Sequence, residues 1–579
     1  MNSTPLNREK ASVPGVIYLE VFRNRLTAIA DEMGVMLQRS AYSTNIKTRQ
    51  DFSCAIFDQS GRAIAQSFSQ PVHLGSLPHF VPKVLEEYGI GNLQPDEVLI
   101  CNDGHRGGVH LNDVLVLAPV FDNAKPAAFV ATIAHHLDVG GSTPGSLGLA
   151  TDVFQEGVRI PPVRIMRGGQ INQDVFKLIA NNIRSPRDTS GDLRAQLAAV
   201  GIGTRRVQEL IAQRGASHFA ESGESLLKYS KARVLSAVSK LPAGTYEAVD
   251  YMDDDGMTDE AIPIAVKIEI KSDQVVFDLS GCGPQRRCPI NSTYAMTLSN
   301  CAYALRVLVE QDIPVNHAFY EVVKVIAPEG SIVNATSPSA ISGGWLTALR
   351  VCETALAAFA KAMPERLAAG SKGCLVNFSF GALSPRTGEY RVFYEAIGGG
   401  YGARASKDGL DGIQAHGQNT ENSPIEELEA SYPVRMDRYA LIPDSGGDGC
   451  FRGGLGIRRD YLFDQEVILT VMADRVKFAP WGLCGGESAR AARYTVNPDG
   501  EARICHSKAT LRLKAGDIFS VQTAGGGGYG PSSVRKRQAI LDDILDLKIT
   551  PAHANEAYGD DWRTQAPDQD EAPGIATDL

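Results

Sequence analysis

The sequence predicts a mixed α/β (α+β) protein of several domains, with a β-rich C-terminal region and no transmembrane segment. Its 579 residues are 43% hydrophobic and 21% charged, which is ordinary globular composition, and this length predicts roughly three to four domains. Helix-like and strand-like runs follow one another without regular strand–helix–strand repeats, which argues against a simple doubly wound sheet. No apolar run approaches the roughly 20 residues that a membrane-spanning helix needs.

Composition also narrows the classes of partner and compartment. The formal net charge is −10 and no long basic run occurs, which disfavours nucleic acid and a membrane surface as partners. The N-terminus, MNSTPLNREK, lacks the basic-then-apolar order of a secretory signal. The ten cysteines are scattered without a CxxC pair, so we interpret them as reduced thiols and expect a cytoplasmic protein.

Residues 14–240 are predicted to form one α/β region, after a loose N-terminus over residues 1–13. Apolar residues recur at three- and four-residue steps from Pro14 to about Ser40, which predicts an amphipathic helix. Two short apolar runs in FSCAIFDQSGRAIAQS predict a hairpin. The other elements expected here are a helix near 77–88, strands within 97–103, 113–121 and 126–134, and a helix over 204–240 with candidate breaks at Gly215 and Gly223.

The remaining chain divides into four further predicted regions. Residues 241–290 are expected to be β-rich, and 291–440 to be an α/β region with helices over 292–311 and 346–368 and a strand in EVVKVIAPEGSI. Residues 441–530 are Gly-rich and strand-like, and 531–579 are predicted to hold one short helix and a disordered tail.

The residue pattern with the clearest chemistry is a cluster of histidines beside acids and glycines. Six of the eleven histidines lie between residues 73 and 136, far more than a uniform spread would place there: His73, His79, His105, His110, His135 and His136. In NDGHRGGVHLNDVLVL, His110 and Asp113 are three residues apart where a loop enters a strand. In ATIAHHLDVGG, adjacent residues at the strand end point to opposite faces, so only one of His135 and His136 is expected to face the same centre as His110.

Together with Asp51 at the start of the predicted hairpin, these residues supply two imidazoles and two carboxylates. Such a mixed nitrogen and oxygen set suits a divalent zinc, manganese or iron ion with open positions for substrate or water. A satisfied polar cluster and a metal-free acid–base site are the alternatives.

Several further residues have both a chemical and a structural interpretation. Glu156 is a candidate proton-transfer group or a structural carboxylate. His73 and His105 are candidates to line the pocket. For Lys407, Asp408 and Asp411 in ASKDGLDG, the alternatives are a pocket role, a structural turn and a subunit contact. Arg452 in FRGGLG is a candidate to bind an anion or to form a scaffold salt bridge.

The glycine-rich segments do not fit a nucleotide site. AGGGGYG lacks the Lys-Ser/Thr of a phosphate-binding loop, and no strand–helix–strand unit follows it. We therefore interpret these glycines as tight turns and expect no ATP site in this chain. The absence of a G-x-S-x-G elbow also weakens a serine hydrolase interpretation.

Long blocks of the sequence, in order, resemble the hydantoinase B/oxoprolinase family. They are NDGHRGGVHLNDVLVLAPV, AHHLDVGG, QEGVRIPPVRI, PINSTYAMT, NATSPSAISGG, GGGYGARASKDGLDGI, NSPIEELEASYPVRMDRY, DSGGDGCFRGGLGIRRDY and GGGGYGP. The resemblance covers about residues 14–550. It implies metal ligands at Asp51, His110, Asp113 and His135, with His136 as the substitute for His135. Asp138 is then expected either to orient a ligand or to cap the Gly-Gly turn. The candidate catalytic residues are Glu156, Asp138 and His136.

The resemblance also implies a hetero-oligomer, such as α2β2, with an ATP-binding partner chain of the hydantoinase A type. The function hypothesis is an ATP-dependent hydrolase that opens a cyclic amide, such as a hydantoin, 5-oxoproline or a lactam, after the partner has activated the carbonyl. The alternatives are the metal-binding subunit of an ATP-dependent ketone carboxylase, of the acetone or acetophenone type, and a non-catalytic scaffold for the ATP-binding chain.

Overall fold

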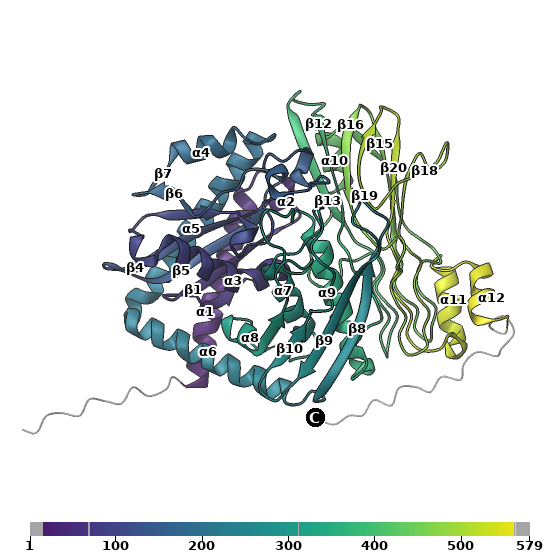
Figure 1. Cartoon of the computed structure of the whole chain (residues 1–579), viewed down its shortest axis with the longest axis horizontal. Helices are drawn as coiled ribbons and strands as arrows, with labels where there is room; N and C mark the ends of the chain where they lie inside the picture. Colours follow the sequence, from purple (N-terminus) through teal and green to yellow (C-terminus); the bar gives the residue numbers. More distant parts are fainter. Residues whose placement is uncertain (1–14, 68–69, 311, 561, 563–579) are drawn as a thin grey trace, which may run out of the picture.

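The computed structural model describes residues 15–67, 70–310, 312–560 and 562, and it confirms the predicted mixed α/β fold class. Within that range the strands form four sheets, and the helices pack mainly around the first two (Figure 1). The predicted loose N-terminus and almost all of the predicted disordered tail lie outside the described residues.

The N-terminal half is built on a seven-stranded antiparallel sheet in which the predicted hairpin and the three predicted strands are confirmed. Its strand order is β2-β1-β5-β4-β3-β6-β7. The strands are β1 (Phe52–Asp58), β2 (Ala63–Gln66), β3 (Val98–Cys101), β4 (Asp113–Asp122), β5 (Lys125–His135), β6 (Val163–Arg167) and β7 (Gln170–Ile171).

Helices cover both faces of this sheet, so its central strands are apolar on both sides. Val114 and Val116 of β4 pack on the face covered by α1 (Val16–Ser40), α5 (Pro186–Arg214) and α6 (Ala216–Val238). Leu115 and Leu117 pack on the opposite face, with α3 (Pro71–Tyr88) and α7 (Tyr294–Arg306). This alternation decides which face each polar residue at the strand ends occupies.

Helix α5 begins at Pro186, well before the predicted start at residue 204. Glycines made residues 186–203 a poor helix by propensity, but two of them are needed for close packing. A Cβ on Gly191 would lie 2.3 Å from the Tyr42 ring, and one on Gly203 would lie 2.4 Å from the Met33 sulfur. Of the two candidate breaks, Gly215 ends the helix and Gly223 lies inside α6.

The next region confirms the expected strands and helices around a second sheet. The strand order β11-β10-β9-β8 uses β8 (Gly244–Met252), β9 (Ile262–Ile270), β10 (Val275–Asp278) and β11 (Val323–Ile326). Helix α9 (Gly344–Ala360) packs across β8 and β9, and α8 (His317–Val322) precedes β11. Two short helices of the N-terminal half are α2 (Thr44–Lys47) and α4 (Gln173–Ala180).

Two more sheets make the C-terminal region β-rich. One has the order β13-β12-β16-β19 and the other β14-β15-β20-β17-β18. Their strands are β12 (Val376–Leu383), β13 (Tyr390–Ile397), β14 (Val434–Leu441), β15 (Ile457–Phe463), β16 (Val467–Met472), β17 (Arg493–Val496), β18 (Arg503–Ile504), β19 (Lys508–Leu513) and β20 (Ile518–Gln522). Helix α10 (Ile425–Ser431) precedes β14. Two helices follow the sheets, α11 (Arg537–Leu545) and α12 (Pro551–Tyr558), where one was expected.

The glycine-rich segments form a layer of extended chains, and most are not the tight turns that the sequence suggested. Backbone hydrogen bonds link one segment to the next, from Gly447 N to Gly526 O (2.8 Å), Gly526 N to Gly454 O (2.8 Å) and Gly454 N to Tyr401 O (2.9 Å). A Cβ on Gly453 would lie 1.7 Å from the Gly526 carbonyl oxygen. The glycines are therefore required by the close approach of neighbouring backbones.

A buried carboxylate joins the first half of the chain to the start of α9. The Glu156 oxygens accept hydrogen bonds from the backbone amides of Ile341 (2.8 Å) and Ser342 (2.7 Å). Burial raises the pKa of Glu156 to about 7, although these hydrogen bonds lower it. No helix within the described ranges combines the length and the hydropathy that a membrane-spanning segment requires.

Replacing Gly453 by Ala should destabilise the glycine-rich layer, because the new methyl group overlaps the Gly526 carbonyl. We expect a loss of about 1–3 kcal/mol or more, seen as a lower unfolding midpoint. Gly500→Ala is the matched control, since a Cβ there meets nothing within 4 Å. Equal midpoints for the two variants would contradict the packing role.

The raised pKa of Glu156 predicts a pH-dependent stability that Glu156→Gln should remove. The protonated acid is favoured in the folded state, so its contribution is complete below the ordinary pKa of 4.5 and is lost as the pH rises through about 7. Relative to the Gln variant, the wild type should lose roughly 3 kcal/mol of unfolding free energy over this window. Denaturant titrations across the pH range measure this difference, and parallel curves for the two proteins would count against it.

Candidate metal centre

Three strand ends at one edge of the first sheet bring the predicted ligand-bearing residues together. Asp113, the first residue of β4, is the direct cross-strand partner of His135, the last residue of β5. Asp51 immediately precedes β1, and its carbonyl accepts a hydrogen bond from the His135 amide (3.0 Å). Because directly opposed residues share a face, the Asp113 and His135 side chains both point toward the α3 side of the sheet.

The side chains converge on the Asp113 carboxylate. His135 Nδ1 lies 3.2 Å from Oδ1, and His110 Nε2 lies 3.3 Å from Oδ2. His73 Nε2, from the first turn of α3, lies 3.3 Å from Oδ1. His110, Asp113 and His135 each offer a donor atom within 4.8 Å of the other two, and all three are buried. The structure thus places His73, left open in the sequence, beside the predicted set.

Hydrogen bonds among the described residues leave this cluster incompletely satisfied. Asp113 Oδ2 is buried without such a partner, and so are His110 Nδ1, His135 Nε2 and His73 Nδ1, the ring nitrogens other than the ones that lie close to Asp113. Metal–ligand bonds of about 2.1 Å place neighbouring ligand atoms roughly 3.0–3.4 Å apart, which matches the separations around Asp113. The mixed nitrogen and oxygen donors suit a divalent transition ion.

Electrostatics keep these groups in the forms that bind a cation. Burial lowers the pKa of His110 to about 4, so its imidazole is neutral near pH 7. Burial raises the pKa of Asp113, but the adjoining histidines, including the hydrogen bonds from His135 and His73, hold it well below its usual value. The Asp51 carboxylate acts to raise the pKa of both His110 and His73, but Asp51 is outside the group of three residues whose donor atoms lie within 4.8 Å of one another.

His136 lies on the opposite face of the sheet from His135, as alternation predicts. Its Nε2 is 2.9 Å from Gln196 Oε1 of α5, and Gln196 also donates to the Val114 carbonyl (2.9 Å). Of the two adjacent imidazoles, the structure therefore joins His135 to Asp113 and His110.

Asp138 and Glu156 are engaged in holding loops. The Asp138 carboxylate accepts hydrogen bonds from the amides of Gly140, Gly145 and Arg184 and from the Arg184 guanidinium, which corresponds to the turn-capping interpretation. The Glu156 carboxylate faces the loop before α9, as described above.

The other weighed residues lie apart from the ligand cluster. His105 is beside an open cleft of about 760 Å³ that His79 and Arg106 also line, and its Nε2 is 2.9 Å from the Ser339 carbonyl. Arg452 forms buried ion pairs with Asp411 (3.2 Å) and Asp543 (3.2 Å), so it is a scaffold residue. Asp408 pairs with Arg535 (2.8 Å) in the same network, while Lys407 makes a backbone turn with Arg404.

Three residues that the sequence did not single out surround the cluster. The Asn45 amide donates to Asp51 Oδ2 (3.4 Å) and to the His135 carbonyl (2.8 Å). The Tyr394 ring of β13 stacks on His135 with centroids 4.7 Å apart, and Arg49 lies over that ring. The spacing N-x3-R-x-D in TNIKTRQD is a sequence signal that could have indicated two of them, Asn45 and Arg49.

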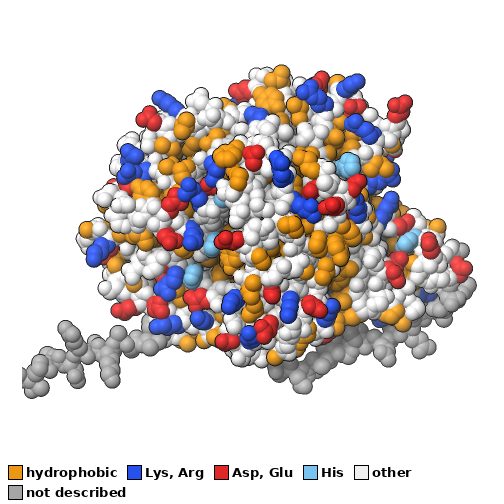
Figure 2. All heavy atoms as spheres, viewed as in Figure 1, with side chains coloured by type: hydrophobic (Ala, Val, Ile, Leu, Met, Phe, Trp, Pro, Cys, Tyr) orange, Lys and Arg blue, Asp and Glu red, His pale blue; other side chains and the backbone are white. Residues whose placement is uncertain are grey.

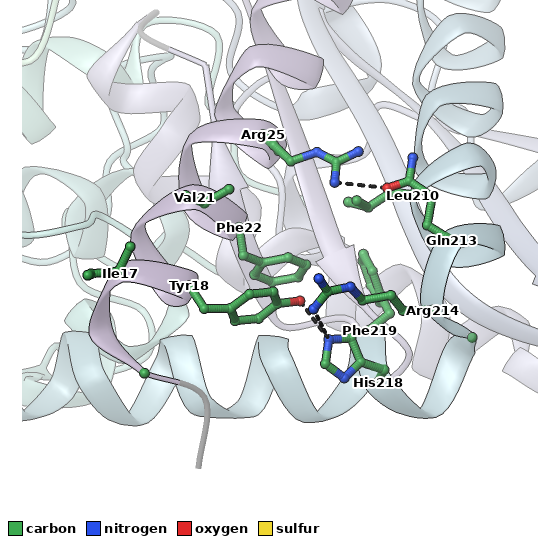
Figure 3. Close-up of a pocket in the computed structure, with 12 residues that line it drawn as sticks. Ile17, Tyr18, Val21, Phe22, Arg25, Leu210, Gln213, Arg214, His218 and Phe219 are labelled. Atoms are coloured by element: carbon green, nitrogen blue, oxygen red, sulfur yellow. Dashed lines mark hydrogen bonds between the residues drawn. The ribbon is translucent and has the colours of Figure 1, made fainter. Parts of the chain in front are cut away.

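The molecular surface also carries a recess away from this cluster. It measures about 550 Å³ and lies between the start of α1 and the junction of α5 and α6, with Tyr18, Arg25, Arg214 and His218 in its lining (Figure 3). On the face shown in Figure 2, acidic and basic side chains are interspersed with exposed hydrophobic ones.

Relatives of known sequence match most of this chain. A protein of Methanocaldococcus jannaschii is 39% identical over 94% of this chain and 95% of its own length. A putative D-/L-hydantoinase subunit of a Pseudomonas species is 32% identical over 94% of each chain. The 5-oxoprolinase 1 of Arabidopsis thaliana is 34% identical over 90% of this chain, which spans only 42% of that longer protein.

Two solved structures share the fold. The ATP-dependent caprolactamase of Pseudomonas jessenii superposes with a TM-score of 0.87 and 25% identity, over 95% of this chain and 96% of that one. A nucleotide-free acetone carboxylase also has a TM-score of 0.87, with 18% identity, over 94% of this chain and 79% of that one. The family model for hydantoinase B/oxoprolinase matches residues 16–532, so the chain belongs to the hydantoinase B/oxoprolinase family.

Proposed function

We propose that this chain is the metal-binding subunit of an ATP-dependent hydrolase that opens a cyclic amide. The observation that carries the proposal is the buried group of His110, Asp113 and His135 at one edge of the first sheet, in a chain of this family. Asp51 is proposed as the fourth ligand. The names of its relatives, a hydantoinase subunit, a 5-oxoprolinase and a caprolactamase, support a hydantoin, 5-oxoproline or a lactam as the substrate class.

A cyclic amide carbonyl is a poor electrophile, and this sets the roles of the two proposed subunits. An ATP-using partner of the hydantoinase A type would phosphorylate the carbonyl oxygen, which makes the ring carbon a better electrophile for water. The ring C–N bond would then break, and hydrolysis of the resulting acyl phosphate by a second water would release phosphate. A bound zinc, manganese or iron ion would supply Lewis-acid polarisation of an oxygen ligand. His110, His135 and Asp113 would hold that ion, and β13 covers the site from the side of Tyr394.

We propose that His73 exchanges a proton with the substrate during ring opening. Its imidazole reaches the site from α3, independently of the sheet, and Asp113 raises its pKa although burial lowers it. A group that accepts and returns a proton is needed when a ring C–N bond breaks and the nitrogen leaves as an amine.

The central test removes single ligands from the complex with the ATP-binding partner. In His110→Ala and Asp113→Ala, we expect loss of bound metal and a fall in substrate-dependent ADP release by a factor on the order of 100 or more. Hydantoin, 5-oxoproline and caprolactam are the probes, and metal content is measured by elemental analysis. His79→Gln, a half-buried histidine outside the cluster, is the control and should retain both properties. Full activity in metal-free ligand variants would leave a scaffold role instead.

Dependence on bicarbonate separates the proposal from a ketone carboxylase, whose acetone-processing example shares the fold. For a cyclic amide hydrolase, ADP release should be the same in degassed buffer and in buffer with added bicarbonate. ADP release that requires both acetone or acetophenone and bicarbonate would identify the carboxylase.

A further inference from the structure

Arg49 is an unusual residue beside the candidate metal centre, because it is a fully buried cation without an acidic partner. Its side chain is 0% exposed, and within the described part of the chain no ion pair joins it to a carboxylate. The guanidinium donates to three neutral oxygens: Asn45 Oδ1 (2.7 Å), the Tyr394 carbonyl (2.8 Å) and the Glu421 carbonyl (3.1 Å). Burying an unpaired charge is costly, so its position calls for a role other than stability.

The contact with Asn45 determines which way that amide points. Arginine has only donors, so the amide oxygen of Asn45 must face Arg49. The Asn45 NH₂ group then faces the other way, toward Asp51 Oδ2 (3.4 Å) and the His135 carbonyl (2.8 Å). In the flipped orientation, the amide oxygen would face two further oxygens and the NH₂ group would face the guanidinium, so all three contacts would be mismatched.

The Arg49 guanidinium also contacts the ring of Tyr394, which packs on His135, a proposed ligand. Arg49 lies 4.8 Å from the centroid of Tyr394, whose ring stacks on His135 at 4.7 Å and 23°. Asn45, Arg49 and Asp51 all belong to the short turn around α2, whereas Tyr394 comes from β13 of the C-terminal half. Arg49 therefore contacts both the turn around α2, which carries Asn45 and Asp51, and strand β13, which carries Tyr394.

We propose that Arg49 is a positioning residue for the metal centre: it orients the Asn45 amide, which in turn holds the Asp51 carboxylate and the His135 backbone in the ligand geometry. The inference rests on the proposed function, in which Asp51 and His135 are ligands. A positioning role for Arg49 and a purely electrostatic effect of its charge predict opposite changes in cation affinity. Removing a nearby positive charge alone would tighten cation binding, whereas losing the amide orientation would weaken it.

The experiment measures metal affinity in the full-length chain after chelation, by titration with Zn²⁺ against a chromophoric chelator. We expect Arg49→Met to raise the Kd for Zn²⁺ by about 10–100-fold. Arg49→Lys keeps the charge and one donor for Asn45, and should raise the Kd less. The visible spectrum of the Co²⁺-loaded protein should shift in Arg49→Met and return toward the wild-type spectrum in Arg49→Lys.

A double-mutant cycle with Asn45→Ala tests whether Arg49 acts through Asn45. Asn45→Ala should weaken Zn²⁺ binding by itself, and adding Arg49→Met should have little further effect. Arg452→Met is the matched control, because it removes another buried arginine far from the site and should leave the Kd within about twofold of the wild-type value.

The outcomes separate the inference from the function on which it rests. A folded Arg49→Met variant with an unchanged or lower Kd would overturn the positioning role and leave the proposed function intact. Additive effects in the double mutant would overturn the route through Asn45. If Arg49→Met does not fold, the Lys variant and the Asn45→Ala spectrum decide the question. Failure of the wild-type chain to bind any of Zn²⁺, Co²⁺, Mn²⁺ and Fe²⁺ would reject the proposed function itself.

Discussion

The register between β4 and β5 is the constraint on which the candidate site depends. Pairing Asp113 directly with His135 places a carboxylate and an imidazole on one face, and the neighbouring β1 brings Asp51 to the same edge. A slip of one residue would exchange His135 for His136 and point the wrong imidazole at the centre. The register is held by the apolar alternation of both strands, since each strand buries one row of side chains against α5 and the other against α3.

This part of the site was predictable because it follows from local pattern. The period of two in a strand was enough to infer that only one of His135 and His136 faces His110. The apolar runs were also enough to predict the strands that carry Asp113 and His135. Metal binding at these residues stays a prediction, since the structure shows the arrangement of the donors alone. His73 was harder to place, because its position depends on how α3 crosses the sheet.

The residues that the sequence did not reveal act over long separations. Arg49 and Tyr394 are 345 positions apart, and no pattern near either one indicates their contact. The prediction that the glycine-rich segments form tight turns was wrong for a similar reason. Gly453 and Gly526 resemble turn glycines in isolation, but their requirement comes from a backbone that returns from elsewhere in the chain. Local propensity also missed the start of α5, where Gly191 and Gly203 serve contacts with Tyr42 and Met33.

The burial of the site ties the proposed chemistry to the assembly of the two halves of the chain. Two carboxylates, three imidazoles and the Arg49 guanidinium are removed from water where the first sheet meets β13, and several of their polar atoms have no partner within the described residues. Such desolvation is unfavourable unless a charge of opposite sign occupies the centre. A divalent ion there would offset the two carboxylates and give Asp113 Oδ2 a partner, so its binding free energy would add to the stability of the junction. The ion would therefore bind most tightly when strand β13 is packed over the site, because β13 excludes water from the donors and holds Tyr394 against His135.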